Sequence, residues 1–217
     1  MTNRAGSFAS FVASRLPGPS ARVLEVGCGS GDLACGLAQA GHDVTAIDPD
    51  APDGPIFRQV RLEDFDEARM FDAVVASRSL HHIEDLPAAL DRIVELLGPR
   101  RQLLVDEFAW DRLDASTARW YFERLRALAD AGGNTAPTTF EACRSDWTEK
   151  HGELHTSTTM LAELTARFAE RHFSWEPYLY RYPEGSASEA QESELIRAGA
   201  IQATGFRYVG EPLPGPA

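Results

Sequence analysis

The residue types best suited to chemistry in this chain lie in three short segments. The first, Glu25 to Gly31, alternates glycine with small or polar residues, and the second is an acid, Asp48, further along the chain. The third holds two adjacent histidines, His81 and His82. Glycines let a backbone pass close to a ligand, an acid after the next strand can accept hydrogen bonds from ribose hydroxyls, and histidine exchanges protons near neutral pH. The pattern predicts an adenosine-like ligand beside a proton-transfer group.

Short apolar runs place these segments at the ends of strands. Residues 23–24 precede the glycine segment, residues 33–38 follow it with helical spacing, and the apolar run 44–47 ends at Asp48. A strand, a glycine turn, a helix and a second strand in this order are typical of nucleotide-binding α/β proteins. Strands and helices continue to alternate over residues 22–107, which favours a parallel sheet with helices on both faces.

The glycine spacing argues against a dinucleotide ligand. The fingerprint G-x-G-x-x-G places its third glycine where this chain has Asp32, and here the third glycine comes one residue earlier, at Gly31. An acid at a helix N-terminus repels a pyrophosphate. Glu25, inside the first strand, favours a cationic ligand group instead. A nucleotide-dependent oxidoreductase is therefore a disfavoured alternative.

The pattern E-x-G-x-G-x-G over residues 25–31 resembles motif I of the class I methyltransferases, which use S-adenosylmethionine. That ligand carries a sulfonium and an ammonium but no phosphate. The runs FDAVVAS (71–77) and LHHI (80–83) look like the fourth strand of this family and the segment after it, and the match covers residues 20–108 closely. The resemblance implies a Rossmann-like α/β fold with a seven-stranded, mostly parallel sheet. Ligands would then bind beyond the carboxyl ends of the strands, at the switch point between the first and the fourth.

We expect a single methyltransferase domain over residues 1–217, with a helical lid inserted after the fifth strand. Its core would cover about 20–108 and 156–211, and the substrate lid about 110–155, a stretch that is long for a simple connection. The patterns beyond the second strand predict the following elements: a helix at 86–97 capped by Asp85, a helix at 111–130, an irregular polar segment at 134–155, a helix at 158–169, a strand at 173–182, a turn at 183–188, a helix up to about 202, a last strand at 205–210 and a disordered tail at 211–217.

The resemblance also assigns contacts with the cofactor. Asp48 would hold the ribose diol, and Pro49 would press on the adenine. Where many family members carry an acid for the adenine amine, this chain has Arg61, so that either Glu63 or Asp64 takes over this role or both are surface carboxylates. The expected cofactor-binding residues are Glu25, Gly27, Cys28, Gly29, Gly31, Asp48, Pro49, Leu62, Glu63 and Ser77.

Residues after the fourth and fifth strands are expected near the transferred methyl group. His81 would be a general base or a substrate contact, or else a structural histidine satisfied by backbone groups. Arg78 would position an anionic substrate or pair with Asp85 or Glu84. The expected catalytic residues are His81, His82 and Glu107, and the expected substrate contacts are Arg78, His81, Asp106, Trp110, Trp147 and His155.

Composition limits the partners. The formal net charge of −12 repels phosphate backbones, so nucleic acid is a poor partner. Cys28, Cys35 and Cys143 form no C-x-x-C pair and are read as small buried residues of a reducing compartment. We expect no metal, no membrane span and no signal peptide, and therefore a cytoplasmic protein.

Together these patterns predict methyl transfer from S-adenosylmethionine, which leaves S-adenosylhomocysteine, to an O, N or C atom of a small molecule. An aromatic or heterocyclic intermediate of secondary metabolism is the expected acceptor. One alternative is the same fold using this cofactor for non-methyl chemistry, such as aminopropyl transfer. Another is a ligand-binding protein without turnover. The acceptor atom and the oligomeric state are not indicated by the sequence.

Overall fold

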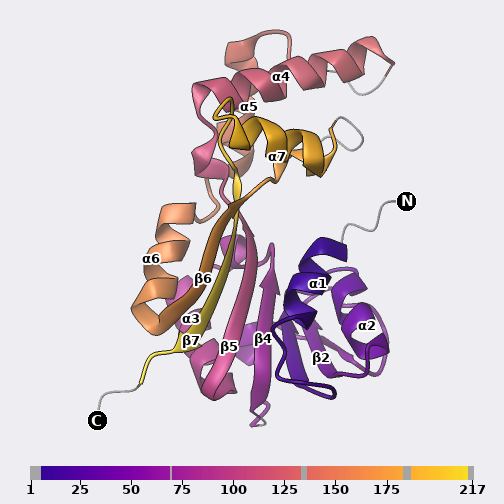
Figure 1. Cartoon of the computed structure of the whole chain (residues 1–217), viewed down its shortest axis with the longest axis vertical. Coiled ribbons are helices and arrows are strands. Elements are labelled where there is room, and N and C mark those ends of the chain that lie inside the picture. The colour runs from indigo at the N-terminus through magenta and orange to yellow at the C-terminus, as the bar shows by residue number, and fades with distance from the viewer. Residues whose placement is uncertain (1–5, 69, 133–135, 183–186, 215–217) are drawn as a thin grey trace. The chain divides into compact units, whose positions relative to one another are not determined.

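The computed structural model describes residues 6–68, 70–132, 136–182 and 187–214 (Figure 1). The chain forms two compact units. The first contains the chain up to Glu107, together with residues 160–173 and the stretch from Arg207 onward. The second contains residues 108–159 and 174–206. Within the described residues, no helix combines the length and the apolar character needed to cross a bilayer.

Within the described ranges, the strands form one seven-stranded sheet in the order β3-β2-β1-β4-β5-β7-β6. Strand β1 pairs in parallel with both β2 and β4, and the β2–β3 and β4–β5 pairs are parallel as well. The chain therefore reverses its winding direction between β1 and β4, which confirms the predicted fold and its switch point. The strands are β1 (Arg22–Val26), β2 (Asp43–Asp48), β3 (Phe57–Gln59), β4 (Phe71–Ser77), β5 (Leu97–Phe108), β6 (Phe168–Glu176) and β7 (Gly205–Pro212).

Helices α1 (Gly6–Ala13) and α2 (Asp32–Gln39) pack on the β1–β2–β4 part of the sheet (Figure 1). Their apolar side chains share one buried cluster with strand residues such as Val23 and Val75. Because parallel strands are covered on both faces, β1 and β4 are buried along most of their length. This packing holds the carboxyl ends of β1, β2 and β4 at one edge of the sheet.

Helix α3 (Leu86–Leu96) begins where the sequence predicted. The side chain of Asp85 accepts a hydrogen bond from the Ala88 N–H at 3.1 Å, which is an N-cap, and Pro87 lies in the first turn. Short 3-10 helices η1 (Leu62–Asp64) and η2 (Leu80–His82) follow β3 and β4.

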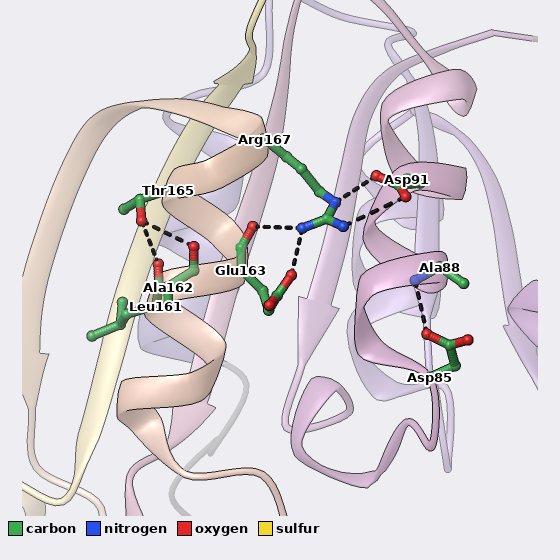
Figure 2. A network of polar contacts seen from close by, with 8 residues as sticks. All are labelled: Asp85, Ala88, Asp91, Leu161, Ala162, Glu163, Thr165 and Arg167. Atoms are coloured by element: carbon green, nitrogen blue, oxygen red, sulfur yellow. Dashed lines mark hydrogen bonds and ion pairs between the residues drawn. The ribbon is translucent and has the colours of Figure 1, made fainter.

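Arg167 joins α3 to helix α6 (Ser157–Arg167) within the first unit (Figure 2). Its Nε lies 2.5 Å from Asp91 Oδ1 on α3, and its Nη1 lies 2.5 Å from Glu163 Oε2, one turn back on α6. These carboxylates hold the pKa of Arg167 above its ordinary value, mainly through the hydrogen bond with Asp91. The ion pairs anchor α6 against the helix that follows η2.

The second unit contains helices α4 (Ala115–Asp130), α5 (Phe140–His151) and α7 (Glu189–Arg197) and the 3-10 helices η3 (Trp110–Arg112) and η4 (Leu179–Arg181). Its aromatic cluster contains Phe108, Trp147 and Tyr178. Glu192 of α7 is fully buried, and its carboxylate accepts the backbone N–H groups of three successive residues, Tyr178 to Tyr180, at 2.9, 3.1 and 2.6 Å. Burial raises the pKa of Glu192 in spite of these hydrogen bonds.

Several predicted elements were wrong. The segment 134–155 is not irregular, because α5 occupies residues 140–151 of it. The aromatic strand runs over residues 168–176 rather than 173–182, and α7 ends at Arg197. Strand β7 continues to Pro212, so the start of the expected disordered tail is ordered. Most of the turn expected at 183–188 lies outside the described residues, as do the last three residues of the chain.

Candidate active site

Three glycines give the turn between β1 and α2 its shape. Gly27, Gly29 and Gly31 have φ angles of 71°, 49° and 77°, a left-handed region that side chains disfavour. A Cβ at Gly27 would lie 2.3 Å from Ser79 Cβ, and one at Gly31 would lie 2.4 Å from the Phe57 ring. A Cβ at Gly29 would meet nothing within 4 Å. Packing within the protein therefore requires the outer two glycines, whereas the exposed middle one leaves open space for a ligand.

Asp48 ends β2 and supports this turn. Its Oδ2 accepts the Gly29 N–H at 3.0 Å, and its Oδ1 accepts the Asp50 N–H at 2.9 Å. A carboxylate oxygen has two lone pairs, so each oxygen can accept a second hydrogen bond. The half-buried Asp48 is thus held in place and can still accept from a ligand diol. Pro49, the next residue, is exposed.

Glu25 lies inside β1 with 3% of its surface exposed, and its Oε2 is buried without a hydrogen-bond partner. Burial raises the pKa of this carboxyl to about 8, although the Ala34 N–H and the charge of Arg78 act in the opposite direction. An unpartnered buried carboxyl is unfavourable, and a cation placed beside it would favour ionisation. Cys28, in the same turn, is buried, and burial raises the pKa of its thiol to about 12, so it is a poor nucleophile.

An open groove of about 560 Å³ lies between η1 and the start of α3. Glu63 and Asp64 both line it, whereas the side chain of Leu62 is buried in the protein and leaves its backbone for any ligand contact. The alternatives for Glu63 and Asp64 stay open, because both are exposed carboxylates at the rim of a groove. The groove is lined by Arg61, Glu63, Asp64, Glu84, Asp85 and Pro87.

The end of β5 holds the residues of η2 in place. Glu107 Oε2 lies 2.5 Å from Nδ1 of His81, and its Oε1 accepts the Leu80 N–H at 2.7 Å. Both side chains are buried. His82 is exposed, and its ring centroid lies 4.1 Å from that of His81. Partial desolvation, followed by the charge of the neighbouring His81, holds the pKa of His82 below its ordinary value. The structure thus brings together all three residues that we expected to be catalytic.

Asp106 precedes Glu107 on β5 and faces a different partner. Its carboxylate accepts from Arg207 Nε of β7 at 3.2 Å, and its backbone carbonyl accepts the N–H of Arg78 at 2.8 Å. Arg78 follows Ser77 at the end of β4, is exposed and has a φ of 58°. The alternative that Arg78 pairs with Asp85 or Glu84 was wrong: among the described residues, no carboxylate oxygen lies within 4.0 Å of its guanidinium nitrogens. Arg207 was missed, because it is distant in sequence and follows no motif.

The remaining expected substrate contacts belong to the second unit. Trp147 Nε1 donates to the Trp110 carbonyl at 3.1 Å, and Trp110 Nε1 donates to the Leu154 carbonyl at 3.3 Å, so the two tryptophans meet there. His155 is half-buried between α5 and α6. His151 of α5 lies beside Trp147, with its Nδ1 2.8 Å from the Trp147 carbonyl oxygen. In the part of the chain that the structure describes, no group of three or more His, Cys, Asp or Glu side chains has a metal-binding arrangement.

Comparison with models of protein families identifies the family to which this chain belongs. Residues 2–136 match the model of a family described as a methyltransferase domain. The chain is a member of this methyltransferase family. Enzymes of the family use S-adenosylmethionine.

Curated relatives of this methyltransferase agree with the assignment. An uncharacterized methyltransferase of Mycobacterium tuberculosis is 40% identical over 101 residues, which cover 40% of this chain and 50% of that protein. A ubiquinone biosynthesis O-methyltransferase of Xylella fastidiosa is 34% identical over 111 residues, or 44% of this chain and 45% of that protein. The chain thus matches about half the length of these relatives.

Solved structures share the fold of this methyltransferase at low sequence identity. An N-methyltransferase from Bradyrhizobium japonicum, in complex with S-adenosylhomocysteine, has a TM-score of 0.53 and 16% identity, with 95% of this chain and 83% of that chain covered. A didemethyltoxoflavin N-methyltransferase from Burkholderia thailandensis has a TM-score of 0.58 and 17% identity, with 98% and 80% covered. At these identities the similarity shows the fold alone.

Proposed function

We propose that this methyltransferase transfers the methyl group of S-adenosylmethionine to an O, N or C atom of a small aromatic or heterocyclic molecule of secondary metabolism, in the cytoplasm. The observation that carries the proposal is the buried Oε2 of Glu25, which has no hydrogen-bond partner beside a glycine turn whose middle residue, Gly29, leaves open space. A cationic, phosphate-free ligand group fits both features.

The chain contains suitable groups for each part of this cofactor. Glu25 would pair with its ammonium, the backbone at residues 27–31 would follow its amino acid tail, and Asp48 would accept hydrogen bonds from the ribose diol. Pro49, the Leu62 backbone and Glu63 would line the adenine, and Ser77 would lie near the sulfonium. Because Asp48 is already oriented by two backbone N–H groups, its oxygens need little reorganisation when a diol binds.

The bound cofactor supplies an electrophilic methyl group on a sulfonium. The chain contributes alignment, exclusion of water and removal of a proton from the acceptor. With Glu107 ionised, Nδ1 of His81 carries its proton toward that carboxylate, and Nε2 becomes the basic nitrogen of the ring. Glu107 would stabilise the imidazolium that forms when Nε2 takes the proton of a phenol or a ring N–H. His82, whose pKa is lowered by partial desolvation and by the charge of His81, would remain neutral beside it.

The part of the second unit from 110 to 155 would act as the substrate lid. Its aromatic cluster supports this role, since flat acceptors stack well on such side chains. Trp110, Trp147 and His155 would be the acceptor contacts. The name of one curated relative is that of an O-methyltransferase, which supports an acceptor that loses a proton from oxygen.

Two measurements test the proposal. Isothermal titration with S-adenosylmethionine, S-adenosylhomocysteine and NAD should show binding of the first two alone, whereas binding of NAD alone would refute the cofactor. Incubation with S-adenosylmethionine and a metabolite panel, followed by mass spectrometry, should show one product heavier by a CH₂ group. Cofactor binding without any such product would favour a ligand-binding protein, and transfer of a larger group would favour non-methyl chemistry.

A further inference from the structure

We propose that Arg78 is a carboxylate-binding residue at the edge of the cofactor site. This inference rests on the proposed function and deepens it. The carboxylate comes from the amino acid tail of the cofactor or from the methyl acceptor, and in the second case the acceptor is an anionic molecule.

The backbone of Arg78 is the first observation. Its φ of 58° lies in the left-handed region, where glycine is the unstrained choice. The Asp106 carbonyl holds the Arg78 N–H at 2.8 Å, which maintains this conformation. Strained residues of this kind concentrate at ligand-binding sites because the surrounding structure keeps them in place for function. Because Arg100 shares this conformation, the assignment of a ligand role to Arg78 rests also on the charge of Arg78 and on its place at the carboxyl end of β4.

The charge of Arg78 is the second observation. The chain has 33 acidic residues against 21 Lys and Arg, so acidic partners are plentiful. Arg101 lies 2.6 Å from Asp72, and Arg92 lies 2.8 Å from Glu95. Arg78 is exposed and, within the described residues, has no carboxylate oxygen within 4.0 Å. Its guanidinium is therefore available for a ligand.

The groups near Arg78 indicate which kind of ligand it would bind. Glu25 pairs with Val75 in the register of β1 and β4, so Arg78 follows three residues beyond the partner of Glu25 at the carboxyl end of β4. The charge of Arg78 accordingly lowers the pKa of Glu25 against the effect of burial, and within the described residues the two side chains form no ion pair. Glu25 can bind an ammonium group while Arg78 binds a carboxylate. Both ligand groups can belong to the amino acid part of the cofactor. Alternatively, the ammonium belongs to the cofactor and the carboxylate belongs to the methyl acceptor.

Two further features select a carboxylate over a phosphate. Asp32 and Asp48, like Arg78, act on the charge of Glu25, so the surroundings are acidic and oppose a dianion. A guanidinium also presents two parallel N–H donors, which match the two oxygens of a carboxylate. The segment from Arg78 to His81 is tied to β5 through Asp106 and Glu107, so a carboxylate on Arg78 would lie on the same anchored segment as the proposed base.

The test compares Arg78→Gln with Arg100→Gln. Arg100 is a matched control, because it is exposed, has a φ of 60°, forms no ion pair within the described residues and lies at the amino end of β5. Titration with S-adenosylhomocysteine and with methylthioadenosine, which lacks the amino acid group, tests the cofactor as the source. Titration of the S-adenosylhomocysteine complex with para-hydroxybenzoate and with phenol tests the acceptor as the source.

Two results support the proposal and identify the source. If the cofactor supplies the carboxylate, Arg78→Gln weakens binding of S-adenosylhomocysteine about 10- to 100-fold and leaves methylthioadenosine unchanged. If the acceptor supplies it, S-adenosylhomocysteine binding is unchanged, and the wild-type preference for para-hydroxybenzoate over phenol disappears. Arg78→Lys should recover only part of either loss, because it keeps the charge but not the two parallel donors.

A variant that relieves strain separates this role from a structural one. Arg78→Gly should raise the melting temperature, since glycine adopts the left-handed conformation freely, and should weaken carboxylate binding as much as Arg78→Gln does. The proposal is overturned if Arg78→Gln changes neither titration, or if Arg100→Gln produces the same losses. A wild-type protein that binds no S-adenosylhomocysteine would instead refute the proposed function.

Discussion

Glu107 connects His81 to the backbone of its own segment. One carboxylate oxygen lies 2.5 Å from His81 Nδ1, and the other accepts the Leu80 N–H at 2.7 Å. A single buried side chain on β5 thus sets both the position of the segment and the orientation of the imidazole within it. The two functions of Glu107 can be separated by mutation.

Glu107→Gln should lower kcat about 10²- to 10⁴-fold, the range typical of lost general-base catalysis, and should leave the KM for the cofactor nearly unchanged. The glutamine keeps one acceptor for Leu80 but cannot stabilise a protonated imidazole. Steady-state kinetics with the acceptor found by the metabolite screen provide the measurement. Glu95→Gln, an exposed variant in a surface ion pair, serves as the control.

A double mutant sharpens this prediction. If Glu107 acts through His81, then adding Glu107→Gln to His81→Gln should cost little beyond the single His81 change. Fully additive losses in kcat would show that Glu107 works independently of the histidine.

Glu25 should make cofactor binding depend on pH. Burial raises the pKa of its carboxyl to about 8, so the empty protein is mainly protonated there at neutral pH. A bound ammonium favours the ionised form, so that binding releases a proton and affinity for S-adenosylhomocysteine should rise from pH 6.5 to about 8.5 and then level off. Titration calorimetry in buffers of different ionisation enthalpy measures the proton directly. Glu25→Gln should bind weakly at every pH and release no proton.

The raised pKa of Glu25 also affects folding stability, which should fall with rising pH while the affinity for the cofactor increases. Because the pKa in the folded state, about 8, lies above the ordinary value of 4.5, the contribution of Glu25 to stability is present below 4.5 and is lost as the pH rises through 8. Glu25→Gln should therefore have the higher melting temperature at pH 9 in the absence of ligand. A lower melting temperature at that pH would contradict the assigned ionisation.

The glycines of the turn should respond differently to alanine. Gly27→Ala and Gly31→Ala should lower the free energy of unfolding by about 1–3 kcal/mol or more, because the new Cβ meets Ser79 or Phe57 and the φ angle is positive. Gly29→Ala should cost about 1 kcal/mol of stability, since its Cβ meets nothing, yet should weaken S-adenosylhomocysteine binding at least tenfold.

A helical glycine provides the control for this series. Gly36 of α2 also has nothing within 4 Å of an added Cβ, so Gly36→Ala should stabilise the protein by about 1 kcal/mol and leave binding unchanged. Urea unfolding and calorimetry measure the two properties. Normal binding by Gly29→Ala would remove the middle of the turn from the cofactor site.

Glu192→Gln should lower the stability of the second unit by about 1–3 kcal/mol, because the amide provides one acceptor oxygen where the carboxylate provides two. The difference in stability between the wild type and Glu192→Gln should become smaller as the pH rises. Burial raises the pKa of Glu192, so the wild type loses stability on ionisation and the glutamine does not.

Tryptophan fluorescence during urea unfolding monitors this change, since all four tryptophans of the chain belong to the second unit. Glu194→Gln, on the exposed side of the same helix, is the control. The tryptophans are Trp110, Trp120, Trp147 and Trp175. Equal effects of the two variants would show that the buried carboxylate anchors nothing.

Local patterns made the first half of the fold predictable. The strands around Gly27 and Asp48 are short buried runs ended by turn residues, and Asp85 followed by Pro87 is a strong signal for the start of a helix. Each signal lies within a few residues of the element that it predicts. The nearness of the glycine turn, Asp48 and η2 followed from the rule that parallel strands share an edge.

Contacts between distant segments were not predictable in the same way. Helix α5 was missed because only Cys143 and Trp147 of its residues are buried, which is too few for an apolar stripe. The pairing of Asp106 with Arg207 joins neighbouring strands that are remote in sequence, and no motif marks Arg207. Glu107 could be proposed from its place at the strand end, but its contact with Nδ1 of His81 required the register of β5.

That register follows from an irregularity at the start of β5. Leu97 pairs with Phe71, whereas Gln102 pairs with Ala73, so extra residues of β5 are accommodated there before Asp106 comes opposite Ser77. Neighbouring strand residues point to opposite faces of a sheet. Inserting a single residue into the irregularity would place Asp106 where Glu107 now contacts η2 and would turn the side chain of Glu107 to the opposite face of the sheet. Whether a glutamate or an aspartate lies beside His81 therefore depends on the number of extra residues at the start of β5, which is the end of the strand far from the proposed active site.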